Sequence, residues 1–323
     1  MICLMDCANI SGMKSFAIIG TGAVGGYYGG LLQKAGLDVH FLLHSDYDFV
    51  KQNGLTVESV NGDFRLPQVK AYNDPKQMPR CDAVIVSLKT TANRILKDVL
   101  PHVIKEDGVV LTLQNGLGSE EEIASITGPE RVIGGLSFLC SNKVGPGHIC
   151  HVDYGLITLG EYRADGKPGG ITPRLEQLGA TMRSAGMEIQ LIEDLSLARW
   201  KKLVWNIPFN GLTVVKNCLT DELVKNPENR ALCRTLMDEV AAAAAVCAHP
   251  IEPEFIDKMM THTEKMTPYA PSMKLDFDRG NPMEIESIYG NPVRAAKAAG
   301  ISMPETEKLY RQLLQVERDL RAR

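Results

Sequence analysis

Short apolar runs alternate with longer amphipathic segments along the first half of the chain. Residues 16–19, 38–43, 83–88 and 109–113 are nearly continuous apolar runs, which are typical of strands covered on both faces of a sheet. A helix-like segment that ends near Gly36 follows the first of them. This alternation predicts an α/β fold built on a Rossmann-like, doubly wound parallel sheet.

The pattern changes near residues 192–194. Before that point we expect further strands at 55–60, 64–69, 131–139, 147–152 and 156–160, and a helix at 172–185. From Ser196 onward the apolar positions recur with helical spacing almost throughout, with helices around 241–245, 253–260 and 304–320.

Two domains are predicted, because 323 residues exceed the size at which one hydrophobic core keeps growing. A Rossmann-like nucleotide domain is expected at residues 13–193, and an all-helical domain at 194–323, with the functional cleft between them. Residues 1–12 add nothing to the first strand, so we interpret them as an extension or as the product of an upstream start codon.

The first strand runs directly into the sequence G-x-G-x-x-G, which opens the first helix. Gly20 would permit the tight turn, Gly22 would let a pyrophosphate approach the backbone, and Gly25 would let the helix pack closely on its strand. The motif alone is weak evidence, since glycine-rich turns also serve simple packing, but the flanking strand and helix favour a dinucleotide site. The predicted cofactor contacts here are Gly20, Thr21, Gly22, Ala23, Val24 and Gly25.

The end of the second strand bears on which nucleotide is bound. An acid at this tip would select the free ribose 2′-hydroxyl of NAD, whereas this chain has His44 and Ser45 there, followed by Asp46. His44 and Ser45 could both donate hydrogen bonds to a 2′-phosphate. We therefore predict NADP(H), with His44 as a contact, although Asp46 lies close by and a solvent-facing role for His44 stays open.

Two later strands also end in polar residues. Lys89 follows the strand at 83–88, and Asn115 follows the strand at 109–113. Ligands of open α/β sheets bind beyond the carboxyl ends of the strands, so both side chains are predicted at the cofactor site. A lysine at a helix N-terminus opposes the helix dipole, which favours an anionic ligand over a solvated role for Lys89.

Composition narrows the choice of partner. The net charge is −4 and the pI is near 6.0, without a dense Lys/Arg block, which argues against nucleic acid or a membrane surface. Eight cysteines without C-x-x-C spacing are typical of a reduced, cytoplasmic protein. No apolar run reaches transmembrane length. On a strand, His148 and Cys150 would face one side and His151 the other, so no metal site is expected.

The helical domain opens with a second unusual pattern. Lys202, Asn206 and Asn210 recur every four positions and so share one stripe of a helix. Trp200 and Phe209 lie among them, and such neighbours should bury the stripe. Buried polar groups are costly without partners, which a substrate pocket would supply. The alternative is a solvated stripe on a surface helix.

These motifs together resemble the ketopantoate reductase (2-dehydropantoate 2-reductase) family, in order over nearly the whole chain. The features that carry the resemblance are the glycine turn, Lys89, the turn at 114–116, Trp200-x-Lys202, Asn206, Asn210, Ser272-Met273 and Glu284. The resemblance implies an enzyme that reduces 2-dehydropantoate (ketopantoate) to pantoate with NADPH, as in pantothenate biosynthesis.

The resemblance also implies roles for individual residues. Lys202 is expected to be the proton donor, and Glu284 to help bind substrate and organise Lys202. Asn115 is expected between nicotinamide and substrate. Asn206, Asn210 and Ser272 are expected to hold the substrate. Independently, hydride delivery to a ketone builds negative charge on oxygen, which a cation such as Lys202 would meet.

Two positions depart from the family pattern at the substrate end. Thr220 and Tyr269 stand where asparagines are expected. A related reductase acting on another 2-keto acid, branched or aromatic, therefore remains an alternative. A nucleotide-sensing protein without catalysis is a further one, which Lys202 and Glu284 argue against. The sequence does not fix the oligomeric state, and a homodimer is kept as one alternative.

Overall fold

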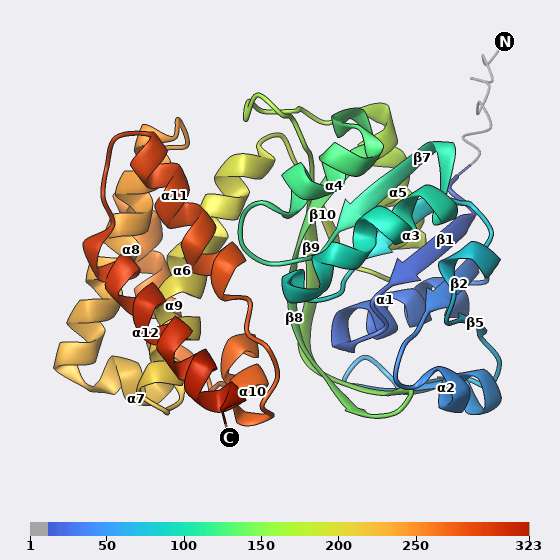
Figure 1. The fold of residues 1–323 in the computed structure, drawn as a ribbon, viewed down its shortest axis with the longest axis horizontal. Helices are drawn as coiled ribbons and strands as arrows, with labels where there is room; N and C mark the ends of the chain where they lie inside the picture. Colours follow the sequence, from blue (N-terminus) through green and yellow to red (C-terminus); the bar gives the residue numbers. More distant parts are fainter. Residues whose placement is uncertain (1–11, 323) are drawn as a thin grey trace, which may run out of the picture.

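The computed structural model describes residues 12–322, and it places a sheet-containing domain beside a helical one (Figure 1). The interpretation of residues 1–12 as an extension falls almost wholly outside the described part of the chain. The strands are β1 (Ser15–Ile19), β2 (Asp38–Leu42), β3 (Leu55–Ser59), β4 (Phe64–Leu66), β5 (Lys70–Tyr72), β6 (Cys81–Val86), β7 (Ile104–Thr112), β8 (Val132–Gly145), β9 (His148–Glu161) and β10 (Ile189–Ile192).

Within the described residues the sheet domain has five α-helices, with three short 3₁₀ turns between them. The helices are α1 (Ala23–Lys34), α2 (Tyr47–Asn53), α3 (Leu96–Val103), α4 (Ser119–Thr127) and α5 (Pro173–Ser184), and the turns are η1 (Pro75–Gln77), η2 (Thr90–Ile95) and η3 (Pro129–Arg131). The second domain contains α6 (Leu195–Val215), α7 (Thr220–Lys225), α8 (Pro227–Val246), α9 (Pro253–Lys265), α10 (Ser272–Asp278), the π-helical turn η4 (Glu286–Gly290), α11 (Asn291–Ala298) and α12 (Pro304–Arg321).

The α/β fold is confirmed, but the sheet is mixed rather than wholly parallel. Its strand order is β4-β3-β9-β8-β7-β6-β1-β2-β5, with β10 beside β9. The strands from β8 to β5 in this order pair in parallel, whereas β8 with β9 and β3 with β4 are antiparallel. The two residues between β8 and β9 allow only a hairpin, because a parallel connection needs about a dozen residues or more. The expectation of a parallel sheet is wrong for these two pairings, whereas β3 and β10 both pair with β9 in parallel.

Strand β9 is also longer than expected, because the segments predicted at 147–152 and 156–160 form one strand. The break between them is Tyr154, with φ of 62°, and Gly155, with φ of 144°. The pairing with β8 shifts register there instead of ending. The positive φ values are thus absorbed as a bulge within a continuous strand.

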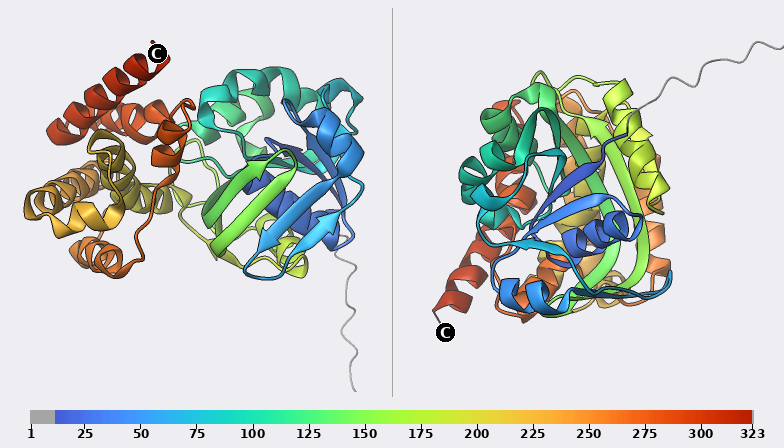
Figure 2. Two further views of the ribbon diagram at one scale, coloured as in Figure 1. Left: turned by 90° about the horizontal axis from the view of Figure 1, so that it is seen from below. Right: turned by 90° about the vertical axis from the view of Figure 1, so that its right-hand side faces the viewer.

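Separate apolar clusters stabilise the two domains. Along β1, Phe16 and Ile18 face the cluster with α1 and α5, while Ala17 and Ile19 face the cluster with α3 and α4. This period of two is what a strand covered on both faces requires. The helical domain has its own cluster around α6 and α8, and the left-hand view of Figure 2 shows this domain beside the sheet domain. No helix within residues 12–322 is long and apolar enough to cross a membrane.

Contacts from the ends of β6 and β7 hold the helical domain against the sheet domain. The Leu117 backbone N–H donates to the Ser287 carbonyl at 2.9 Å, and the Asn291 amide donates to the Leu117 carbonyl at 2.6 Å. A Cβ at Gly116, whose φ is +85°, would lie closer than 3.0 Å to the Ser287 backbone. Glycine at this position therefore lets the loop after β7 press directly on η4.

Candidate active site

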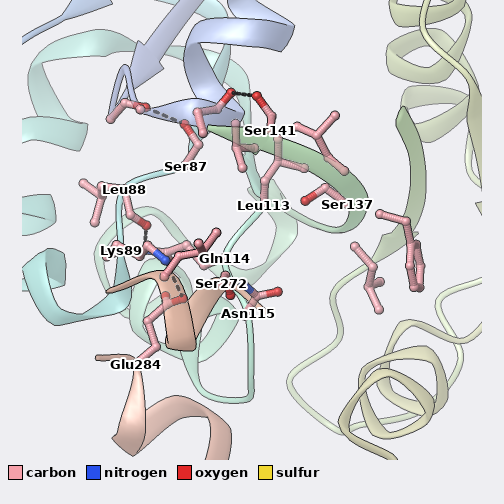
Figure 3. A pocket seen from close by; sticks show the side chains of 18 of the residues that line it. Ser87, Leu88, Lys89, Leu113, Gln114, Asn115, Ser137, Ser141, Ser272 and Glu284 are labelled. Atoms are coloured by element: carbon pink, nitrogen blue, oxygen red, sulfur yellow. Dashed lines mark hydrogen bonds and ion pairs between the residues drawn. The ribbon is translucent and has the colours of Figure 1, made fainter. Parts of the chain in front are cut away.

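A large cavity of about 1340 Å³ lies where the two domains meet, and both contribute to its lining. Every site residue predicted from the sequence lines it, except Gly25. These residues are Gly20, Thr21, Gly22, Ala23, Val24, His44, Lys89, Asn115, Lys202, Asn206, Asn210, Ser272 and Glu284. Figure 3 shows Lys89, Asn115, Ser272 and Glu284 gathered on one side of it, with Ser137 and Ser141 along β8.

The glycine turn joins β1 to α1 at one end of the cavity. A Cβ at Gly20, whose φ is +97°, would come closer than 3.0 Å to the Leu88 backbone, and one at Gly25 would come as close to Ser87 and the Gly20 carbonyl. Around Gly22, by contrast, nothing lies within 4 Å of such a Cβ. Gly20 and Gly25 are required by packing of the chain itself, whereas Gly22 leaves open space in front of the α1 N-terminus. That space fits the pyrophosphate of a dinucleotide.

The residues after β2 line the same cavity as the glycine turn. His44 and Ser45 are exposed to the cavity, as a contact with an adenine ribose requires. Asp46, the residue that complicated the choice of nucleotide, is buried, and its carboxylate forms an ion pair of 2.6 Å with Lys143. Lys143 comes from β8 and also lines the cavity.

Lys89 forms ion pairs with two carboxylates of the helical domain. Its Nζ lies 2.7 Å from Asp276 Oδ2 and 3.7 Å from Glu284 Oε2. Burial disfavours the charge of Lys89, but Glu284 and Asp276 outweigh it, and the pKa of Lys89 is raised. Glu284 is itself buried and accepts a hydrogen bond of 3.0 Å from the Thr90 backbone N–H. The lysine is therefore held charged at the junction of the two domains.

The turn after β7 presents Asn115 to the cavity and fixes its neighbour Gln114. The Gln114 amide donates to the Leu88 carbonyl at 2.8 Å and to Asn93 at 2.6 Å. The Gln114 carbonyl accepts from Arg199 of α6 at 2.7 Å. Because Gln114 is anchored on both sides, the backbone that carries Asn115 has a defined position at the carboxyl edge of the sheet.

Lys202 projects from α6 toward β8. Its Nζ donates to the Ser137 carbonyl at 3.0 Å and lies 5.3 Å from the centre of the Phe138 ring. The pKa of Lys202 is lowered to about 7, chiefly because the side chain is buried and also because Arg199 lies near, while Glu284 acts in the opposite sense. Within the described residues no hydrogen bond or ion pair joins Lys202 to Glu284 directly, so Glu284 acts on Lys202 through its field.

The two asparagines of the α6 stripe are buried, as the sequence pattern predicts. Asn206 and Asn210 are 6% and 3% exposed, and both line the cavity. Asn210 Oδ1 accepts a hydrogen bond of 3.2 Å from the Met273 backbone N–H, which joins α6 to the first turn of α10. Ser272, the first residue of α10, therefore lies beside the stripe and lines the cavity with it.

The two departures from the family pattern contact each other. The Thr220 hydroxyl accepts from the Tyr269 backbone N–H, and the Thr220 N–H donates to the Tyr269 carbonyl, both at 3.2 Å. The Tyr269 ring lies 6.4 Å from that of Trp205, and burial raises its pKa. Tyr269 and Trp205 both line the cavity. The two changes thus form one unit, in which Tyr269 lines the cavity and the buried Thr220 holds its backbone from behind.

Sequence reasoning missed three ionised groups around the cavity. Asp276 pairs with Lys89, Lys143 pairs with Asp46, and Arg199 pairs with Glu120, the last two residues both being buried. Each pair joins segments more than 75 residues apart, so no local spacing shows it. Among residues 12–322 no group of three His, Cys, Asp or Glu side chains could hold a metal ion.

Comparisons with known proteins agree over both domains. A family model described as "Ketopantoate reductase PanE/ApbA" matches residues 16–164, and one described as "Ketopantoate reductase PanE/ApbA C terminal" matches 194–317. A 2-dehydropantoate 2-reductase of Nostoc sp. is 56% identical over 93% of this chain and 94% of its own.

Solved structures show the same likeness. The crystal structure of 2-dehydropantoate 2-reductase from Geobacter metallireducens has a TM-score of 0.89 at 44% identity, covering 93% of this chain and 99% of the other. A ternary structure of D-mandelate dehydrogenase with NADH and anilino(oxo)acetate has a TM-score of 0.84 at 22% identity, over 95% and 99% of the two chains. At that identity the second likeness concerns the fold alone.

A sheet domain with a glycine turn after its first strand, joined to a helical domain around one cavity, is the architecture of a nicotinamide-dependent oxidoreductase. The family models cover more than half of the chain. This chain belongs to the ketopantoate reductase family.

Proposed function

We propose that this chain reduces 2-dehydropantoate to pantoate with NADPH, and that Lys202 donates the proton. The observation that carries the proposal is the position of Lys202. Its ammonium lies in the shared cavity with a pKa near 7, so it can both hold and release a proton at neutral pH. The name of the Nostoc relative supports the substrate.

The nucleotide wall has residues suited to each part of the cofactor. The N-terminus of α1 and the open space at Gly22 would hold the pyrophosphate. His44 would meet the 2′-phosphate, and Asn115 would lie near the nicotinamide. When bound, NADPH supplies the hydride to the keto carbon and leaves as NADP⁺.

The opposite wall would orient the keto acid. The amides of Asn206 and Asn210 and the hydroxyl of Ser272 line the cavity from α6 and α10, and such groups can donate to the carboxylate and the hydroxyl of the substrate. The ammonium of Lys202 would meet the carbonyl oxygen as negative charge develops and would transfer its proton there. Glu284 favours the charged form of Lys202 and so keeps that proton available.

A steady-state assay of NADPH oxidation tests this proposal. Ketopantoate should give the highest kcat/KM within a panel of branched and aromatic 2-keto acids. The proposal fails if ketopantoate is not turned over, or if another acid of the panel is strongly preferred.

A related reductase of another 2-keto acid is the second candidate, and the pairing of Thr220 with Tyr269 favours it. Tyr269 places an aromatic ring near Trp205 where the family pattern has an amide, and Thr220 holds the Tyr269 backbone. The same panel distinguishes the two candidates. Binding of NADPH without turnover of any acid would instead support a nucleotide-sensing protein.

A cytoplasmic location and a homodimer stay predictions. A Staphylococcus aureus ketopantoate reductase of 22% identity is described as dimeric.

A further inference from the structure

We propose that Lys143 determines the preference for NADPH, because it neutralises Asp46 and offers its ammonium to the ribose 2′-phosphate. This inference rests on the proposed function, in that it assumes a nicotinamide nucleotide in the cavity. It adds a specificity-determining pair, Asp46 and Lys143, to a site whose sequence pointed only to His44.

Asp46 lies close to the position where an acid would favour NAD. It follows His44 and Ser45 at the tip of β2, and all three line the cavity. A carboxylate at this point accepts hydrogen bonds from the 2′-hydroxyl of NAD and repels a 2′-phosphate. Unless its charge were compensated, Asp46 would oppose NADPH.

The structure gives this carboxylate other partners. Asp46 is 7% exposed, and its Oδ2 lies 2.6 Å from Lys143 Nζ and accepts a hydrogen bond of 3.1 Å from the Gly147 N–H. Asp46 is the N-cap residue of α2, yet its side chain caps no backbone N–H of that helix. The carboxylate of Asp46 is thus bonded through Oδ2 to the β8–β9 hairpin, and its charge is compensated there.

Lys143 remains available to an anion. Its side chain is 29% exposed and lines the cavity. An ammonium has three N–H donors, and in the part of the chain that the structure describes Asp46 is its one ion-pair partner. The other donors can therefore meet a phosphate beside His44. One residue removes a repulsion and adds an attraction, and both effects favour NADPH over NADH.

The test is a comparison of dissociation constants for NADPH and NADH, titrated without keto acid. Lys143→Met should raise the constant for NADPH by about 10- to 100-fold, the range expected for loss of a hydrogen bond to a charged group. The constant for NADH should stay the same or fall, because Asp46 is released toward the ribose. Lys143→Arg, which keeps the charge, should retain most of the preference for NADPH.

Two further variants separate the roles of the pair. Asp46→Asn should leave the binding of NADPH unchanged or tighter, because the ammonium is no longer shared. Lys51→Met removes a charge from the exposed end of α2 and should leave the ratio of the two constants unchanged. The preference due to Lys143 should also decrease with rising salt.

Several outcomes would overturn the inference. Equal weakening of both nucleotides by Lys143→Met would mean that the lysine only supports the hairpin. Loss of NADH affinity in Asp46→Asn, with NADPH unaffected, would mean that Asp46 already contacts a ribose hydroxyl. If Lys143→Met does not fold, the dissociation constants of NADPH and NADH for Lys143→Arg and Asp46→Asn are compared instead. Loss of the NADPH preference in Lys143→Arg, or weaker NADPH binding in Asp46→Asn, would then contradict the inference. If the preference for NADPH depends on Lys143 but ketopantoate is not turned over, the proposed substrate is wrong and this inference still holds.

Discussion

The two walls of the cavity are built in different ways. The proposed nucleotide wall is formed mainly by backbone, namely the turn at Gly20 and Gly22 and the ends of β6 and β7. The sheet fixes the position of these segments. The proposed substrate wall is formed by polar side chains, and three of them, Lys202, Asn206 and Asn210, project from the single helix α6. One wall is formed by main-chain geometry, and the other by buried polar side chains.

The two walls should respond differently to substitution. A backbone wall loses its function when a side chain is added, because a Cβ fills the space that a ligand needs. A side-chain wall loses its function when a side chain is removed, and the loss depends on how directly that group meets the reacting atoms. Substitutions should therefore separate the two walls by the step that they affect.

The largest effect is expected at the proton donor. Lys202→Ala should lower kcat by about 10²- to 10⁴-fold, the usual contribution of general acid catalysis. Affinity for NADPH should survive, because the glycine turn belongs to the other wall. The measurement is a steady-state assay together with a nucleotide titration. Lys201→Ala is the matched control, because Lys201 is the neighbouring lysine and pairs with Glu252 instead. Near-native turnover in Lys202→Ala would refute the assignment.

The glycine turn should respond at the binding step. Gly22→Val should raise the dissociation constant of NADPH by about 100-fold or more, roughly 3 kcal/mol, and leave the protein folded, because nothing of the chain lies within 4 Å of the new Cβ. Gly20→Val is the contrasting variant and should unfold at lower temperature, since its Cβ would collide with the Leu88 backbone. Thermal unfolding followed by circular dichroism measures the second effect. Unchanged affinity in Gly22→Val would make the turn purely structural.

The nucleotide wall could be predicted from the sequence because its requirements are local. Positive φ at Gly20 and close packing at Gly25 demand glycine at fixed spacing after a strand. The substrate wall was predicted only in part: helical spacing placed Lys202 and Asn206 on one stripe, but their roles needed the family resemblance. Pairs such as Asp276 with Lys89 depend on tertiary packing across the domain junction, which no local pattern contains.

The antiparallel hairpin of β8 and β9 shows the same limit. Apolar runs predicted that β8 and β9 are strands, but not their direction, which depends on the two-residue turn between them. That hairpin carries Ser137, which accepts from Lys202, and Lys143, which meets Asp46. The part of the sheet whose topology was predicted wrongly is therefore also the part that contacts both walls of the cavity.

A smaller effect is expected on the pH dependence of turnover. Lys202 must be protonated to act as an acid, so kcat should fall as the pH rises through about 7, the pKa of its ammonium. Glu284 raises this pKa, and Glu284→Gln should therefore move the decline to lower pH, by up to about one unit. Profiles of kcat against pH measure the shift. A decline that stays in place would show that another group controls it.

The smallest effect is expected where the substrate wall departs from the family pattern. The Thr220 hydroxyl is buried and accepts one neutral hydrogen bond, from the Tyr269 N–H. Thr220→Ala should therefore cost about 1 kcal/mol of unfolding free energy and, because Tyr269 would be held less firmly beside Trp205, raise KM for the keto acid by about fivefold or less. Thr220→Ser keeps the hydroxyl and should leave both quantities near native. Denaturant unfolding and KM measured on the same preparations test whether the wall is a set of separate contacts. A loss as large as that of Lys202→Ala would mean instead that Tyr269 positions the reacting groups, and the contrast between a rigid backbone wall and a divisible side-chain wall would fail.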